Sequence, residues 1–169
     1  MQDKALYLSA QFDKETQSIL SGYYDALHQT GFVGKQTKNI PYHFTLGSQS
    51  VDYEEQLTDT LDKVCSNTRC IDINLSHIGL FGLNVLFIAP CMNFELLNLQ
   101  QSFFRGCGTG SHNWVAHATL LIDEPETILK ALPIVAANFK PFEARIESVG
   151  LYEFFPARLI KTCTLSAVV

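Results

Sequence analysis

The chain has 169 residues, of which 47% are hydrophobic and 17% charged, a composition typical of a folded globular protein and not of a disordered one. Its net charge of −5 argues against tight, sequence-independent binding along duplex DNA, which requires many phosphates to be neutralised. A nucleotide or a short RNA end needs only a local positive pocket and is compatible with this charge.

The length fits a single domain, residues 1–169, large enough to bury a substantial core. The five cysteines are odd in number and show no Cys-x-x-Cys spacing, which favours reduced thiols in an intracellular protein over a disulfide framework. The first residues are not typical of a signal peptide, and no apolar stretch approaches the roughly 20 residues that a membrane helix needs. We therefore expect a cytoplasmic monomer without membrane contact.

Hydrophobic periodicity predicts alternating strands and helices along the whole chain. The predicted elements are, in order, a strand over 5–12, a helix over 13–31, a strand over 42–46, a helix from 52, strands over 71–81 and 85–89, a helix from 93, a strand from 117, a helix from 123, and strands over 142–151 and 158–165. Asp13 and Asn93 are expected to cap their helices, and Asp52 with Glu55 resembles a capping box. Pro133 should kink or shorten the last helix.

A tetrapeptide of one pattern occurs twice, as His43-Phe44-Thr45-Leu46 and as His117-Ala118-Thr119-Leu120. Each copy follows a flexible loop and occupies a strand between two helices, so the chain divides into two similar halves. Residues i and i+2 of a strand point to the same face, so each histidine projects together with its threonine. A core strand with a satisfied imidazole would explain one copy, but chance would produce two in roughly one chain per thousand of this composition.

On these four residues and this layout the chain resembles the 2H phosphoesterase superfamily, and within it the 2′-5′ RNA ligase and cyclic phosphodiesterase branch. The resemblance implies an α+β, bilobal, duplicated fold in which two antiparallel sheets face a central cleft and the helices lie outside. It also implies phosphodiester chemistry without a metal ion or other cofactor. Trp114 takes the place of the aromatic residue that the family often has before its second histidine, whereas Ala116 replaces a frequent proline. That departure bears on the substrate and not on the catalytic set.

Histidine suits this chemistry because its ordinary pKa of about 6.5 lets one imidazole be neutral while another is protonated. We predict hydrolysis of a 2′,3′-cyclic phosphate or a related phosphodiester of nucleotides or RNA ends, with His43 and His117 as general base and general acid. Thr45 and Thr119 would donate hydrogen bonds to the non-bridging oxygens. The reverse reaction would be 2′-5′ ligation. Which histidine is the acid does not follow from the sequence.

Five further residues lie near the motifs and are candidate substrate contacts: Trp114, Tyr42, Lys38, Arg105 and Tyr152. Trp114 is the candidate for stacking on a base, and the loop cations Lys38 and Arg105 are candidates for attracting phosphate.

Two classes of alternative remain at this stage. The first is a binding module that holds nucleotides or RNA ends without turnover. The second is a metal-dependent or thiol enzyme, which would use His77 and His112 with the motif pair or Cys107 with His117. The usual close spacings of metal ligands are absent, so we predict no metal site.

Overall fold

The structure is a computed structural model that describes residues 4–104 and 114–166. The elements are β1 (Ala5–Phe12), α1 (Lys14–Gln29), β2 (His43–Ser50), α2 (Glu54–Asn67), β3 (Ile71–Phe81), β4 (Val85–Pro90), α3 (Phe94–Phe104), β5 (Ala118–Ile122), α4 (Pro125–Asn138), β6 (Phe142–Phe154) and β7 (Arg158–Thr164), with a short 3₁₀ turn, η1 (Val51–Tyr53), before α2. All predicted elements are present in the predicted order.

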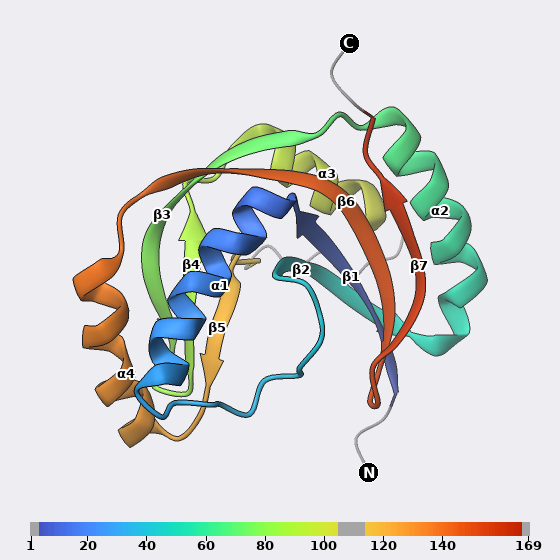
Figure 1. Ribbon diagram of the computed structural model, residues 1–169. Helices are drawn as coiled ribbons and strands as arrows, with labels where there is room; N and C mark the ends of the chain where they lie inside the picture. The colour runs from blue at the N-terminus through green and yellow to red at the C-terminus, as the bar shows by residue number, and fades with distance from the viewer. Residues whose placement is uncertain (1–3, 105–113, 167–169) are drawn as a thin grey trace.

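The seven strands of the described residues form one sheet in which every ladder is antiparallel. The order is β2-β1-β6-β3-β4-β5, and β7 pairs with β6. The expectation of two separate sheets is not confirmed, because β6 belongs to both halves: its first residues pair with β3 and its later residues pair with β1, as Figure 1 shows along the top of the molecule. The duplicated, bilobal organisation of the single domain stays a prediction.

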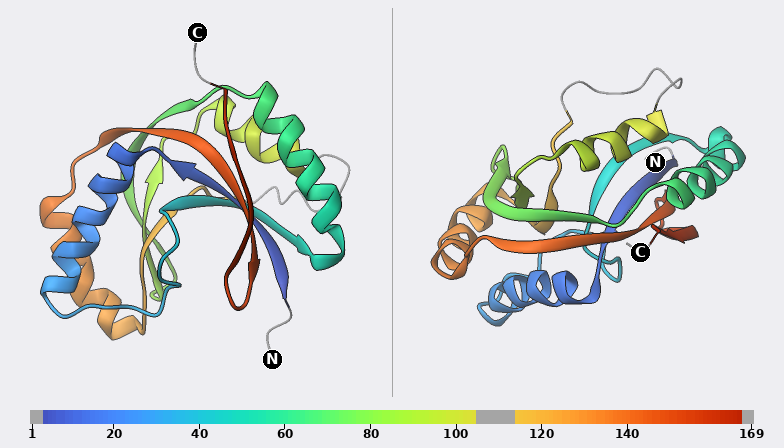
Figure 2. Two further views of the ribbon diagram at one scale, coloured as in Figure 1. Left: turned by 45° about the vertical axis from the view of Figure 1, so that its right-hand side comes forward. Right: turned by 90° about the horizontal axis from the view of Figure 1, so that it is seen from above.

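Two helices cover each half of the sheet. Helices α1 and α4 pack together on the half that contains β5, and α2 packs with α3 near β6 and β7 (Figure 2). Helix α1 therefore follows β1 in sequence but lies on the other half. The buried core includes the predicted inward residues of β1, Leu6, Leu8, Ala10 and Phe12. Burial of each such leucine stabilises the fold by about 1.5–3 kcal/mol.

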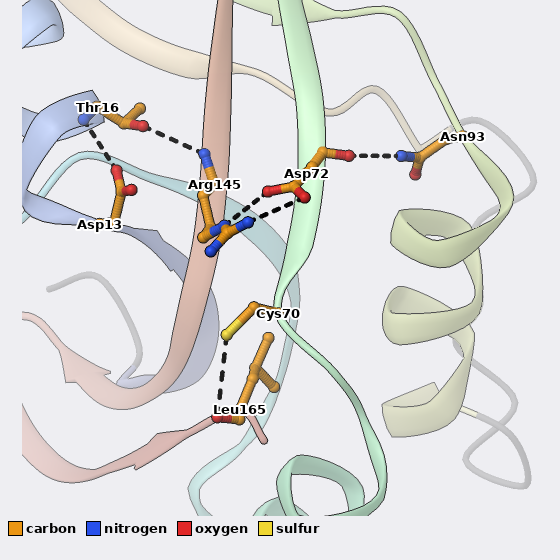
Figure 3. A network of polar contacts seen from close by, with 7 residues as sticks. All are labelled: Asp13, Thr16, Cys70, Asp72, Asn93, Arg145 and Leu165. Carbon is orange, nitrogen blue, oxygen red and sulfur yellow. Dashed lines mark hydrogen bonds and ion pairs between the residues drawn. The ribbon is translucent and has the colours of Figure 1, made fainter. Parts of the chain in front are cut away.

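A polar network fastens the starts of two helices to the centre of the sheet (Figure 3). The Asp13 carboxylate accepts a hydrogen bond from the Thr16 N–H at 2.9 Å, and the Thr16 hydroxyl accepts one from the Arg145 N–H at 3.2 Å. The Arg145 guanidinium binds the Asp72 carboxylate at 2.6 and 3.0 Å, and the Asn93 amide donates to the Asp72 carbonyl at 3.0 Å. The predicted caps Asp13 and Asn93 are both confirmed.

One local prediction is wrong, and a second is wrong in one of its two alternatives. Asp52 and Glu55 do not form a capping box: the Ser50 hydroxyl accepts from the Asp52 N–H and caps the 3₁₀ turn, so α2 begins only at Glu54. Pro133 does not shorten α4, which continues to Asn138. The proline leaves one carbonyl without its helical partner, that of Leu129, and this residue is 53% exposed, so water can replace the lost donor.

The described part of the chain contains no helix that is long and apolar enough to span a membrane. Four cysteines are described, Cys65, Cys70, Cys91 and Cys163, and all four are free thiols. Cys65 is buried, which raises the pKa of its thiol to about 12.

Candidate active site

The two histidines lie at the starts of β2 and β5, the first and last strands of the main strand order. His43 is the first residue of β2, and His117 directly precedes β5. β2 and β5 stand at opposite ends of the strand order, yet they contact one another, because the sheet curves until its edges approach (Figure 1). Thr45 and Thr119 follow two residues later on the same faces as their histidines. The fold therefore brings the two tetrapeptides together.

Both imidazoles have the same local hydrogen bond. The Nδ1 atom of His43 lies 2.7 Å from the Pro41 carbonyl oxygen, and Nδ1 of His117 lies 2.8 Å from the Val115 carbonyl oxygen. A carbonyl oxygen can only accept, so Nδ1 must carry the proton in each ring. In the neutral form, Nε2 of each histidine is then a bare acceptor that is ready to take a proton.

The surroundings of both rings favour the neutral form. Burial lowers the pKa of His43 below its ordinary value, against the opposing effect of the Pro41 hydrogen bond, and the nearby His117 lowers it further. Burial also lowers the pKa of His117, whose ring lies 4.6 Å from that of Phe81 and 5.2 Å from that of Phe87. An apolar wall removes water from the ring and disfavours its charged state. Both histidines are therefore neutral near pH 7 in the ligand-free protein.

A cavity of about 430 Å³ lies beside the motifs, within the size range of small-ligand sites. Its walls include His43, Thr45 and Thr119, whereas His117 is not among the lining residues. The remaining lining residues come from β1, from Tyr24 of α1, from residues 36–42, from Leu120 and Ile122 of β5, and from Phe154 and Phe155 at and just after the end of β6.

Two of the predicted substrate contacts, Lys38 and Tyr42, line this cavity. The Lys38 ammonium donates to the Val33 carbonyl at 2.6 Å and to the Tyr24 hydroxyl at 3.1 Å, so it fastens the loop to α1. The backbone of Tyr42 is held by Gln17, whose side-chain amide donates to its carbonyl and accepts from its N–H, both at 2.8 Å. Gln17 thus positions the residue before His43, and the sequence carried no signal for this role.

Trp114 and Tyr152 have structural partners and are not among the residues that line the cavity. The indole N–H of Trp114 donates to the Thr45 carbonyl at 2.9 Å, which joins the segment before His117 to the strand of His43. Tyr152 is 6% exposed, and its hydroxyl accepts from the Gln11 amide at 3.0 Å. Arg105 lies outside the described residues.

Gly150 makes room for the pair of Gln11 and Tyr152. A Cβ atom at this position would lie 2.7 Å from Nε2 of Gln11 and 2.7 Å from Cε2 of Tyr152. Gln11 pairs across the strands with His43, so this buried pair lies next to the first motif. Gln11, Ser9 and Tyr7 are the alternate residues of β1, and Ser9 and Tyr7 line the cavity. The polar character of these alternate residues is the sequence signal that could have revealed this wall.

The described residues bear on the metal alternative, whereas the thiol alternative stays untested because Cys107 lies outside them. No group of three or more His, Cys, Asp or Glu side chains in that part of the chain is arranged to hold a metal ion. The imidazole of His77 lies beside the Ser76 hydroxyl, with Nδ1 at 2.8 Å from Oγ. His112 and Cys107 lie outside the described residues.

No family model and no curated protein sequence matches the chain. Solved structures do match it. A structure described as a phosphoesterase aligns with a TM-score of 0.67 and 16% identity, over 96% of this chain and 99% of that one. E. coli LigT complexed with NADP+ or with 3′-AMP aligns with a TM-score of 0.64 and 16% identity, over 96% and 98%. The protein TT0787 of Thermus thermophilus aligns with a TM-score of 0.68 and 13% identity, over 98% and 100%.

The TM-scores show that these proteins and this chain share a fold. Identities this low say nothing about the reaction. The similarity covers nearly the full length of both partners in each comparison. The resemblance to the 2H phosphoesterase superfamily, drawn from the two tetrapeptides, is therefore confirmed at the level of the fold.

Proposed function

We propose that the cavity beside the histidines is the active site of a phosphoesterase that hydrolyses a 2′,3′-cyclic phosphate, or a related phosphodiester, of a nucleotide or an RNA end without a metal ion. The observation that carries the proposal is the matched pair of imidazoles, each with Nδ1–H bound to a carbonyl, which leaves Nε2 of the neutral ring without a proton. Pure binding would not need two proton-transfer groups in the same tautomer. The fold shared with LigT, which has been solved with 3′-AMP, supports a nucleotide as ligand.

Binding of the substrate would create the two protonation states that the reaction needs. A phosphodiester carries one negative charge, and an anion within a few ångströms raises the pKa of a histidine. One ring then takes up a proton while the other stays neutral. The neutral Nε2 accepts a proton from water as the water oxygen attacks phosphorus. The protonated Nε2 donates to the ribose oxygen as the P–O bond breaks.

Protons balance over the cycle, because the pair of histidines gains one proton from water and gives one to the leaving oxygen. The products are a phosphomonoester and a free ribose hydroxyl. Each proton transfer contributes about 10²–10⁴-fold to the rate. Thr45 and Thr119 would donate hydrogen bonds to the non-bridging oxygens, where negative charge grows in the transition state. The same roles in reverse would join ends through a 2′-5′ linkage.

The test is turnover of a 2′,3′-cyclic nucleotide in the presence of EDTA. His43→Ala and His117→Ala should each lower kcat by about 10²–10⁴-fold. His77→Ala is the control, because His77 is exposed and its Nδ1 lies 2.8 Å from the neighbouring Ser76 hydroxyl, and the mechanism gives it no role. Activity that survives in the double variant of His43 and His117 would refute the mechanism.

The other functional classes give different results in the same assay. Binding without turnover would identify a non-catalytic nucleotide or RNA-end module. Loss of activity with the chelator would indicate a metal enzyme, and loss after thiol alkylation would indicate a thiol enzyme.

A further inference from the structure

One end of the cavity has an aromatic wall, formed by Tyr7 of β1 and by Phe154 and Phe155 at the end of β6. The ring of Phe154 lies 5.2 Å from that of Tyr7 in an edge-to-face arrangement and 5.3 Å from that of Phe155. Phe155 is 49% exposed, so a flat ligand can reach its ring. The hairpin of β6 and β7 lies beside the first residues of β1 (Figures 1 and 2).

The aromatic wall is about one sugar away from the phosphate end of the cavity. Ser9 of β1 pairs with Thr45, and Tyr7 is the next residue on the same face of that strand. Two residues of an antiparallel strand span about 7 Å. A phosphate held near Thr45 would therefore place the ribose along β1 and the group attached to the ribose beside Tyr7.

The charges of this end favour a neutral ligand group. The described lining contains no carboxylate, and its only ammonium, that of Lys38, already binds the Val33 carbonyl and the Tyr24 hydroxyl. A second phosphate would find no unpaired cation in this lining. A nucleobase is flat and uncharged, and aromatic side chains bind it by stacking.

We propose that the aromatic wall holds the base of a nucleoside whose phosphodiester lies between the histidines, and that it accepts any of the four bases. The inference rests on the proposed function. Stacking tolerates all bases because each has a π face, so the protein requires a base without selecting its identity. Phe155 is the residue of the wall with the largest exposed surface and contributes most to this contact.

The test compares two substrates and three variants. The substrates are uridine 2′,3′-cyclic phosphate and 1-O-methylribose 2′,3′-cyclic phosphate, which has the same reacting bonds without a base. The variants are Phe155→Ala, Phe155→Leu, which keeps an apolar side chain but removes the ring, and Leu159→Ala. Leu159 lies on the same hairpin, is 54% exposed and does not line the cavity, so it serves as the control.

For the uridine substrate, Phe155→Ala should raise KM by roughly 5- to 150-fold with kcat little changed, which corresponds to the loss of one stacking contact. Phe155→Leu should raise it nearly as much, and Leu159→Ala should leave it unchanged. The base-free substrate should have a raised KM in the wild type and should not respond to Phe155→Ala. Cyclic phosphates of adenosine, guanosine and cytidine should have KM values close to that of uridine.

Equal KM values for the two substrates in the wild type would overturn the proposal while the proposed function stands. The proposal would also be overturned if Phe155→Leu had the same KM for uridine 2′,3′-cyclic phosphate as the wild type. Apolar contact without a ring would then be sufficient. If the wild type turns over neither substrate, the proposed function fails. The aromatic wall is then judged by binding of uridine 3′-monophosphate, which Phe155→Ala should weaken and Leu159→Ala should not.

Discussion

Replacing Trp114 by phenylalanine tests how the two histidine strands are held in place. The Trp114 indole donates to the Thr45 carbonyl at 2.9 Å, whereas β2 and β5 share no ladder hydrogen bond in the described sheet. Phenylalanine keeps an aromatic ring at this position and removes only the donor. The change therefore separates the hydrogen bond from stacking on a base, the role that the sequence suggested for Trp114.

The magnitude follows from one lost hydrogen bond. Such a bond contributes about 0.5–1.5 kcal/mol, and water can reach the freed carbonyl because Trp114 is only half-buried. We expect the free energy of unfolding to fall by about 1 kcal/mol, which for a protein of this size lowers Tm by about 2–4 °C. A displacement of a reacting group by about 1 Å can cost about 10²-fold, so kcat should fall by about 10- to 100-fold with KM little changed.

The assay is steady-state hydrolysis of a 2′,3′-cyclic nucleotide together with thermal unfolding. Gln100→Met is the control, because the Gln100 amide donates to the carbonyl of Leu46, the residue next to Thr45, at 3.3 Å. It should lower stability to a similar degree and leave kcat unchanged. A wild-type kcat in Trp114→Phe would refute the positioning role, and a raised KM at constant kcat would favour base stacking.

Three further predictions concern Thr119, the pH dependence and Gly150. Thr119→Val should lower kcat by about 10²–10³-fold with KM little changed, as measured by steady-state kinetics, if the hydroxyl stabilises the transition state. Burial lowers the pKa of both histidines, so the bell-shaped pH profile of kcat/KM should have its maximum below about pH 6.5. The maximum of kcat should lie at higher pH, because the bound anion raises the pKa of the histidines. Profiles of kcat/KM centred above this value would contradict the burial argument. Gly150→Ala should destabilise the fold by about 1–3 kcal/mol in urea unfolding, because its Cβ would overlap Gln11 and Tyr152, whereas Gly22→Ala, with nothing within 4 Å, should not destabilise it.

Features that depend only on residues close by in the sequence were predictable from it. The alternation of β1 and the caps at Asp13 and Asn93 involve residues within one turn or one strand, so a short window contains all the information. The contradicted predictions failed where the surroundings of a residue, and not its own preference, decided the outcome. Ser50 caps the turn that Asp52 was expected to begin, and α4 tolerates Pro133 because the freed carbonyl lies at an exposed residue.

Partners elsewhere in the chain also decide which of the predicted substrate contacts are available to a ligand. Lys38 does lie on the cavity, as its place in the loop suggested, but its ammonium is bound to the Tyr24 hydroxyl and the Val33 carbonyl. Trp114 was recognised by its distance from His117, while its partner, the Thr45 carbonyl, lies 69 residues away. No local pattern reveals which acceptor a side chain will meet after the sheet has formed.

The two His-x-Thr strands are readable in the chain alone, and the tautomer of each imidazole is also a local property, since each Nδ1 binds a carbonyl only two residues earlier. Whether these strands meet is a tertiary matter, because their approach depends on the curvature of a sheet in which β6 serves both halves. Phe81 and Phe87, which lie on other strands than His117, contact its ring, and burial lowers its pKa. The aromatic wall of the cavity comes from Tyr7, Phe154 and Phe155, which are also distant in the chain from both motifs. The proton-transfer groups are thus set by short segments of the chain, and their environment arises from contacts between residues that are distant in it.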